Sequence, residues 1–436
     1  MSFLRRQSVI AALTANVLRP PRGRRAGVPA FAAGWLTGES APQLLALTAL
    51  DAAVQATRSR GRRRTLRQRA GFALAGASAL GLAHVVRQSQ QAREVLEDAL
   101  VDGLGVDYVE QLNQPPTPAE LATPWRRLAT PFSFSDDRVR VIHNQSYTEA
   151  GKRGHLDIYL PAGEDTIADA PVLVQVHGGA WTLGEKEHQG RPLMNQMAAQ
   201  GWVCVAINYR LAPRDPWPAH IVDVKRAIAW VKDNIADFGG NPDYVVITGG
   251  SAGGHLASLA ALTAGDPLLQ PGFEDSDTSV QAAVPFYGVY DFAGSTGLRS
   301  AVEMRDAFLS PRVMHSTWTD TPDVYEAASP ILRITPDAPD FFVLHGDHDS
   351  LVSVDQARLF VDELRRTSEG SVVYVELPGA QHAFDVSHSI RSAHAVRAVD
   401  RYLNWHWNTW RHGLEPDSGV DPDQLDEGAP PPTAAG

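Results

Sequence analysis

The chain has 436 residues, of which 44% are apolar, so it is long enough and apolar enough to form one large core or two ordinary domains. This composition excludes disorder as the main state, and a single cysteine, Cys204, excludes a disulfide scaffold. The net charge of −11 is uneven: residues 1–69 carry 13 arginines and two acids, so the other 367 residues carry −22. An acidic body of this kind argues against a dedicated nucleic-acid enzyme.

The first segment, residues 1–89, combines arginine clusters with apolar stretches. Seven arginines within residues 58–69 are followed by residues 70–86, which have no formal charge. Seventeen such residues are close to the length that spans a bilayer, so we expect a membrane helix over 70–86. The arginines should remain cytoplasmic, which puts the rest of the chain outside the cytoplasm if the helix crosses. A helix lying in the interface would leave it cytoplasmic, and the alternative is a pair of alanine-rich helices in a soluble domain.

Residues 90–134 read as a helical segment followed by a proline-rich connector, with a possible contribution to a cap over a site. From residue 135 to residue 412 the pattern changes to short apolar runs that alternate with helical stretches. The runs VRVIHNQSY and HLDIYLP suggest an antiparallel pair. Six later runs, from PVLVQV to VVYVEL, suggest buried strands. Continuous apolar strands separated by helices predict an α/β fold with a mostly parallel sheet covered on both faces. Residues 413–436 hold six acids and five prolines, and we expect them to be disordered.

The strongest local signal is VVITGGSAGGHLASLAAL, in which a strand is followed by Gly249-Gly250-Ser251-Ala252-Gly253 and then by a helix of small residues. This is the G-x-S-x-G pattern in the strand–turn–helix context that presents a serine nucleophile. The glycines on either side of Ser251 permit a sharp turn and close helix packing.

A second glycine-rich turn, His177-Gly178-Gly179-Ala180-Trp181, ends the strand PVLVQV. Acyl transfer needs N–H donors where the carbonyl oxygen becomes negative, and a glycine-rich loop supplies them. We expect Gly178 and Gly179 to be such donors, joined by the N–H of Ala252. The side chain of His177 is expected to brace the loop.

The remaining groups follow the last two strands. FFVLHGDHDSLV offers Asp347 and Asp349 as acids, and VVYVELPGAQHAFD places His382 after the next strand. The chain order Ser, Asp, His is typical of one class of serine hydrolase. We choose Asp349 because it comes later in the turn and precedes the apolar run LVSV, with Asp347 shaping the turn. A metal cluster in HGDHD is the weaker alternative, because four groups within five residues do not readily converge on one ion.

Together these motifs, with NYRLAPRDPWPAH and ASPI, resemble the α/β-hydrolase esterases and lipases of the bacterial hormone-sensitive-lipase type over residues 135–410. One departure is Ala180, where the family usually has a third glycine. The resemblance implies a serine carboxylic-ester hydrolase that uses Ser251, Asp349 and His382 through an acyl-enzyme, with a small-molecule or lipid ester as substrate and neither metal nor cofactor. The N-terminal region is similar to that of membrane-associated actinobacterial esterases.

Two other functions remain open at this point. HGGxW also resembles arylformamidases and prenylcysteine methylesterases, so an arylformamidase-like amide hydrolase is an alternative. A hydrolase-fold binding protein without catalysis would predict a broken triad, and the three residue types are all present. The segment 291–330 is long enough to form a small lid, and Trp181 and Phe308 are candidate pocket residues.

Overall fold

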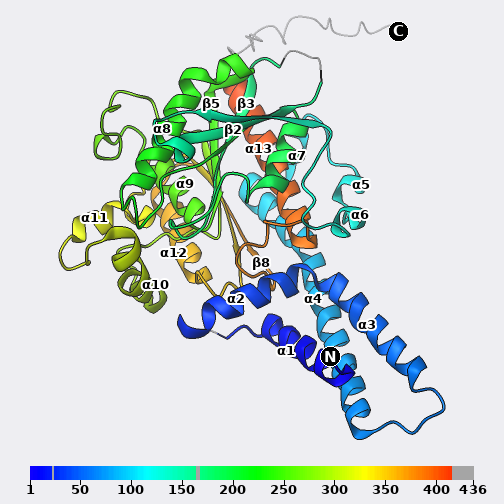
Figure 1. Ribbon diagram of the computed structural model, residues 1–436. Coiled ribbons are helices and arrows are strands. Elements are labelled where there is room, and N and C mark those ends of the chain that lie inside the picture. Colours follow the sequence, from blue (N-terminus) through cyan, green and yellow to red (C-terminus); the bar gives the residue numbers. More distant parts are fainter. Residues whose placement is uncertain (22–23, 164–166, 415–436) are drawn as a thin grey trace, which may run out of the picture.

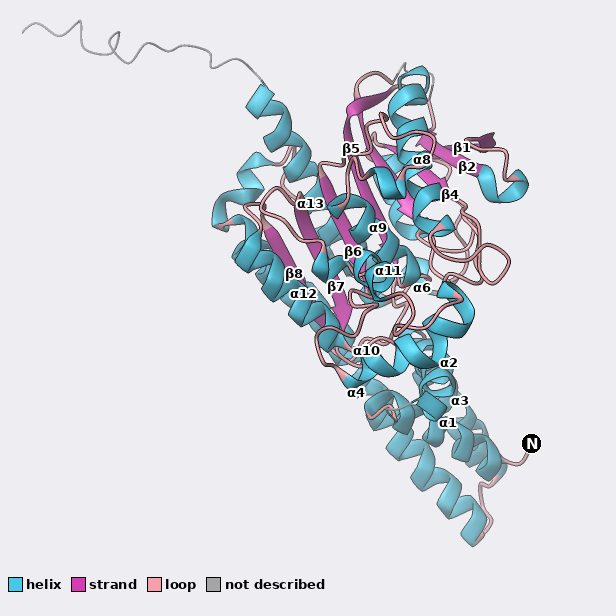
Figure 2. Ribbon diagram, turned by 90° about the vertical axis from the view of Figure 1, so that its left-hand side faces the viewer, coloured by secondary structure: helices cyan, strands magenta, loops and turns pink. Residues whose placement is uncertain are grey.

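The computed structural model describes residues 1–21, 24–163 and 167–414 (Figure 1). The acidic segment 413–436, for which the sequence predicts disorder, lies outside the described residues apart from its first two. The described chain consists of a central sheet with helices on both faces and an N-terminal helical arm that projects from one end (Figure 2).

The sheet has eight strands in the order β1-β2-β4-β3-β5-β6-β7-β8. The pairs β1–β2 and β2–β4 are antiparallel, and the other pairs are parallel. The predicted antiparallel pair and the six predicted buried strands are therefore all present. The strands are β1 (Val139–Ser146), β2 (His155–Pro161), β3 (Ala170–Val176), β4 (Val203–Ile207), β5 (Gly240–Gly250), β6 (Ala282–Phe286), β7 (Asp340–Gly346) and β8 (Val372–Leu377).

Alternate side chains of each strand enter two separate cores, because successive residues of a strand point to opposite faces. In β3, Val172 and Val174 belong to one core and Leu173 to the other. The first core contains apolar residues of α8 (Ala219–Asn234), α9 (Ala252–Leu262) and α12 (Val354–Thr367). The second contains those of α7 (Arg191–Ala199), α13 (Ile390–Leu414) and the end of α4. Both faces are thus covered, and the predicted α/β architecture is confirmed.

The arm consists of α1 (Phe3–Leu18), α3 (Ala41–Arg58) and the first half of α4 (Leu66–Leu104). Helix α4 has 39 residues and is therefore about 58 Å long. Its second half packs against α13 and β8, with Leu96 and Leu100 in the second core. The expected boundary between residues 89 and 90 has no counterpart in the structure, since one uninterrupted helix crosses it.

The segment 70–86 packs its inner face against α1 and α3. The buried residues Gly71, Ala75, Ser78, Leu82 and Val85 are spaced three and four apart, which is the stripe expected for packed helices. A Cβ atom on Gly71 would lie 2.7 Å from the ring of Phe3, so glycine permits the close approach of α1. The outer face of the same segment is exposed.

Helix α2 (Arg24–Glu39) lies across one end of the sheet and its covering helices rather than along the arm (Figure 1). Its last residue, Glu39, accepts hydrogen bonds from Ser389 Oγ at 2.6 Å and from Arg391 Nη1 at 3.0 Å. All three residues are buried. Near its start, the carbonyl of Gly27 accepts a hydrogen bond from Ser350 Oγ at 3.2 Å. The helix is thereby attached to the segments that follow β7 and β8.

The remaining helical elements are short and lie in the connections. They are η1 (Val106–Gln111), α5 (Pro118–Leu121), α6 (Trp125–Leu128), η2 (Gly151–Gly154), η3 (Ile235–Phe238), η4 (Pro267–Leu269), α10 (Arg299–Met304), η5 (Arg305–Met314), α11 (Pro322–Ala327) and η6 (Pro330–Leu332). The segment 291–330, the candidate lid, contains three of them and is referred to as the insertion.

We predict that Glu39→Gln lowers the free energy of unfolding by about 3–5 kcal/mol, because it leaves the guanidinium of Arg391 buried without a counter-charge. Urea denaturation of the full chain measures this change. The matched control is Glu363→Gln, whose partner Arg366 is exposed and which should leave the midpoint almost unchanged. Equal midpoints for both variants would contradict the role given to the Glu39–Arg391 pair.

Candidate active site

Ser251 occupies the turn between β5 and α9 with φ 60° and ψ −121°, a backbone conformation that residues with a side chain rarely adopt. Its N–H donates to the carbonyl of Phe286 at 3.0 Å, which ties the turn to the end of β6. A Cβ atom on Gly253 would lie 2.1 Å from the carbonyl oxygen of Val176. One on Gly249 would lie 2.6 Å from the same oxygen. The glycines of the motif are required by backbone contact with β3.

His382 and Asp349 are brought together from the turns after β8 and β7. The distance between His382 Nδ1 and Asp349 Oδ2 is 2.6 Å. The other carboxylate oxygen accepts hydrogen bonds from the N–H groups of Leu351 and Val352, both at 2.8 Å. Burial alone would raise the pKa of Asp349, but the charge of His382 and hydrogen bonds from His345 and His382 hold that pKa well below its usual range. The carboxylate therefore stays ionised and orients the ring of His382.

Asp347, the alternative acid, bonds elsewhere. Its carboxylate accepts a hydrogen bond from the N–H of Gly379 at 2.7 Å, which connects the turn after β7 to the turn after β8. Burial raises its pKa. The neighbouring His348 lies within 3.1 Å of the carbonyl oxygen of Val17 in α1. Of the side chains considered as a metal cluster, Asp347 and His348 thus bond elsewhere, while His345 Nε2 lies 3.3 Å from Asp349 Oδ2.

The loop after β3 carries the candidate oxyanion donors, and it differs from expectation at one position. The N–H of Gly178 donates to Gln189 Oε1 at 2.7 Å, so this donor is already used. The next residues, Gly179 and Ala180, have φ of 122° and 51°. Their N–H groups have no hydrogen-bond partner among the residues that the structure describes. Of the two loop donors predicted from the sequence, the structure leaves Gly179 free and engages Gly178, while Ala180 offers a further N–H.

His177 braces this loop. Its Nδ1 donates to the carbonyl of Gly178 at 2.7 Å, and its ring stacks on Tyr209 with centroids 4.3 Å apart. Burial lowers its pKa to about 4, so the ring is neutral at pH 7. The hydroxyl of Tyr209 donates to the carbonyl of His177 at 2.9 Å.

A cavity of about 580 Å³ lies beside Ser251 and the His382–Asp349 pair. Ser251, His382, Asp349, Ala180 and Trp181 line it, together with residues of the insertion and of α2: Gly27, Val28, Ser300, Glu303, Met304, Ala307 and Phe308. The described residues include no hydrogen bond between the hydroxyl of Ser251 and the ring of His382, and such contacts are commonly long before substrate binds.

The contribution of α2 was not predicted. Besides Gly27 and Val28, Phe31 places its ring edge-on to that of His382, with centroids 5.7 Å apart. Nothing in the alanine-rich, basic sequence of this helix distinguishes it from the helices of the arm. The segment 90–134, considered as a cap, contributes none of the described residues that line the cavity.

A buried tyrosine packs against the ring of the histidine. The ring of Tyr287 lies 4.5 Å from that of His382, and its hydroxyl donates to the carboxylate of Asp385. Burial raises the pKa of Tyr287 and that of Asp385. Asp385 is therefore a buried second carboxylate behind the site, bonded to Tyr287.

Comparison with known proteins agrees with this geometry. The family model BD-FAE matches residues 156–364. The chain is 49% identical over 358 residues to the probable carboxylic ester hydrolase LipM of Mycobacterium tuberculosis, and the match covers 80% of each chain. It is 46% identical over 318 residues to esterase LipQ of the same organism, covering 72% of this chain and 75% of LipQ.

Among solved structures, the butyrate-bound esterase Est2 of Thermogutta terrifontis is 25% identical and superposes with a TM-score of 0.51, covering 61% of this chain and 93% of Est2. The family follows from the 49% identity over 80% of LipM. The eight-stranded sheet and the serine in a strand–turn–helix turn agree with it. The chain belongs to the α/β-hydrolase esterases and lipases of the hormone-sensitive-lipase type, and it is a carboxylic ester hydrolase.

Proposed function

We propose that the chain hydrolyses esters through Ser251, His382 and Asp349 by way of an acyl-enzyme. Ser251 Oγ attacks the ester carbonyl while His382 takes its proton, and His382 then protonates the leaving alcohol. Water, activated by the same ring, releases the acid. The observation that carries this proposal is the 2.6 Å contact between His382 and the ionised Asp349 in the cavity that Ser251 also lines.

The oxyanion is held by the N–H groups of Gly179 and Ala252, with that of Ala180 in place of the engaged Gly178. Ala252 is the first residue of α9, where the helix dipole favours negative charge. The positive φ angles of Gly179 and Ala180 are consistent with a loop whose successive N–H groups gather around an anion.

The cavity favours an ester of moderate size. Its volume of about 580 Å³ lies within the range of small-molecule sites, and the insertion closes one side with Met304 and Phe308. We therefore propose a small-molecule ester with an apolar acyl group as the substrate class.

Ser251→Ala should abolish hydrolysis of p-nitrophenyl butyrate without unfolding the chain, because the variant has no group to form the acyl-enzyme. Steady-state kinetics and circular dichroism measure both properties. More than about a tenth of the wild-type kcat in a folded variant would overturn the assignment of Ser251.

Asp349→Asn should lower kcat by roughly 10⁴-fold, because an amide neither fixes the ring of His382 in the useful tautomer nor stabilises its charged form. Asp347→Asn is the matched control two residues away, and its effect should be much smaller since Asp347 bonds Gly379. If the control variant loses more activity than Asp349→Asn, the acid has been assigned wrongly.

We also propose that residues 1–89 attach the protein to a membrane, with residues 135–412 as the catalytic domain. Helix α4 is the one helix in the described part of the chain that is long and apolar enough to cross a bilayer. The outer face of its first half carries Ala73, Gly76, Ala77, Leu80 and Ala83.

The positive charge at the end of the arm also supports attachment to a membrane. The end of the arm presents seven exposed arginines: Arg58, Arg60, Arg62, Arg63, Arg64, Arg67 and Arg69. Anionic lipid headgroups attract such a cluster. We place it on the cytoplasmic side, with the catalytic domain extracytoplasmic if α4 crosses and cytoplasmic if the arm lies in the interface.

Replacing Arg62, Arg63 and Arg64 by Gln should lower the fraction of full-length protein that floats with anionic vesicles, because each lost cation weakens attraction to the headgroups. The control triple variant changes three exposed arginines of the catalytic domain, Arg214, Arg299 and Arg366. Carbonate and salt washes, followed by protease access in intact spheroplasts, then separate crossing from surface binding. Equal flotation of both variants would contradict a role for the arginine cluster, and a full-length protein that never floats would contradict the anchor.

A further inference from the structure

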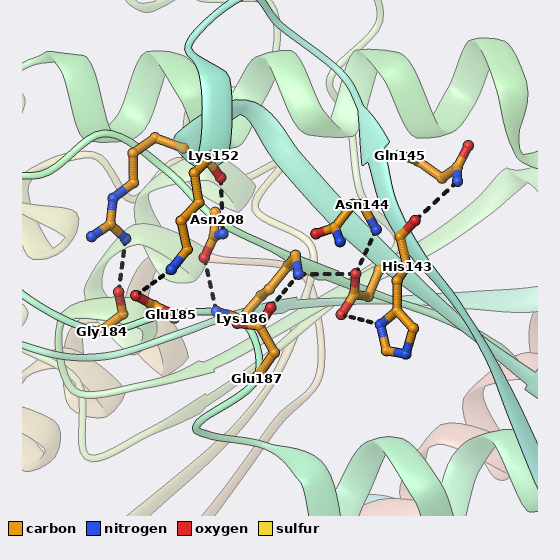
Figure 3. Close-up of polar contacts among 11 residues, drawn as sticks. His143, Asn144, Gln145, Lys152, Gly184, Glu185, Lys186, Glu187 and Asn208 are labelled. Carbon is orange, nitrogen blue, oxygen red and sulfur yellow. Dashed lines mark hydrogen bonds and ion pairs between the residues drawn. The ribbon is translucent and has the colours of Figure 1, made fainter.

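The second half of the loop that carries the oxyanion donors is held by a buried ion pair (Figure 3). Lys186 has a side chain that is 1% exposed, and its Nζ lies 2.9 Å from Asp157 Oδ1. Asp157 belongs to β2 and is fully buried. Nζ also contacts Glu187 Oε1 at 2.5 Å. A loop residue is thereby fixed to the sheet.

The carboxylate of Asp157 also contacts two groups of β1. The N–H of Asn144 donates to Oδ1 at 2.8 Å, and Nδ1 of His143 lies 3.1 Å from Oδ2. A buried ion pair contributes little net stability compared with apolar residues of the same size, because both charges lose their hydration. Its physical effect here is to define one position for the Lys186 side chain.

The backbone is held as well, at Gly184 and at Lys186 itself. The N–H of Lys186 donates to Asn208 Oδ1 at 2.8 Å, and Asn208 Nδ2 donates to the carbonyl of Lys152 at 3.0 Å (Figure 3). Arg153 Nη1 donates to the carbonyl of Gly184 at 2.8 Å. The segment 184–186 therefore has three independent attachments to β2, to the residues before it and to the end of β4.

Gln189 follows three residues later and reaches the other end of the loop. Its Oε1 accepts the N–H of Gly178 at 2.7 Å. A Cβ atom on Gly178 would lie 2.8 Å from the same oxygen and 2.6 Å from the carbonyl oxygen of Gly250, so this packing requires glycine. Fixing the N–H of Gly178 sets the direction of the following peptide groups, those of Gly179 and Ala180.

We infer that Gln189 is a positioning residue for the oxyanion hole, and that the Lys186–Asp157 ion pair keeps Gln189 in place. This inference rests on the proposed function. Donors in such a hole stabilise the charge that develops in the transition state, so misplacing them lowers kcat and leaves KM nearly unchanged. Loss of a whole donor typically costs 10²–10³-fold in kcat, and misalignment should cost less, about tenfold.

The test is Gln189→Met in the full chain, which keeps the length of the side chain and removes the acceptor. With p-nitrophenyl butyrate we expect kcat to fall about tenfold and KM to change less than twofold. The inhibition constant of an alkyl trifluoromethyl ketone, whose serine adduct carries an oxyanion, should rise by the same factor as kcat falls. A kcat at or above wild type, a loss confined to KM, or an unchanged inhibition constant would overturn the inference.

The ion pair is tested with the double variant Asp157→Asn/Lys186→Met, because a single substitution would leave a buried charge unpaired and risk misfolding. It should show the same pattern as Gln189→Met at temperatures well below its Tm. Lys152→Met is the control: it removes the Lys152–Glu185 pair of the same loop, in which Lys152 is 62% exposed, and should stay within twofold of wild type. If the double variant matches this control, the role of the ion pair is wrong.

Failure of the inference is distinguishable from failure of the proposed function. An inactive Ser251→Ala together with a Gln189→Met that behaves as wild type overturns only the positioning role. An active Ser251→Ala overturns the proposed mechanism itself.

Discussion

Close backbone contact at the carboxyl edge of the sheet is the constraint on which the rest of this structure depends. The carbonyl oxygen of Val176 would lie 2.1 Å from a Cβ atom at Gly253 and 2.6 Å from one at Gly249. Only glycine allows the turn of Ser251 to approach β3 in this way. The same contact places the serine beside the loop that follows β3, so the proposed nucleophile and the candidate oxyanion donors share one edge. A side chain at Gly249 or Gly253 would push the serine turn away from β3 and so away from the loop that carries the candidate donors.

The N-terminal arm and the catalytic domain are one continuous structure. Helix α4 enters the second core through Leu96 and Leu100, and α2 is bonded to the turn regions of β7 and β8 through Gly27 and Glu39. Part of the cavity wall, Gly27 and Val28, therefore belongs to the same helical region that carries the arginine cluster. In the chain, α2 lies between α1 and α3, so a helix that lines the cavity is flanked on both sides by helices of the arm.

Two buried ion pairs illustrate how charge can fix position in an otherwise apolar interior. Glu39 with Arg391 holds α2 on the catalytic domain, and Asp157 with Lys186 holds the loop after β3. In each pair both side chains are at most 3% exposed, so neither charge can be satisfied by water when its partner is removed. Each pair joins two separate elements of the fold, α2 with α13 and β2 with the loop after β3.

The sequence by itself determined the sheet and the residue types of the site. Alternating strands and helices were evident from continuous apolar runs, and the elbow glycines, the acid turn and His382 were found because chemistry requires them next to strand ends. Features that depend on contacts between residues far apart in the chain were decided only by the tertiary structure. Periodicity does not tell a membrane helix from one packed on α1 and α3, and residues 70–86 lie within a helix that runs from Leu66 to Leu104. The use of the Gly178 N–H by Gln189, and the presence of α2 in the cavity wall, follow from hydrogen bonds and packing between separate segments, which no local pattern encodes.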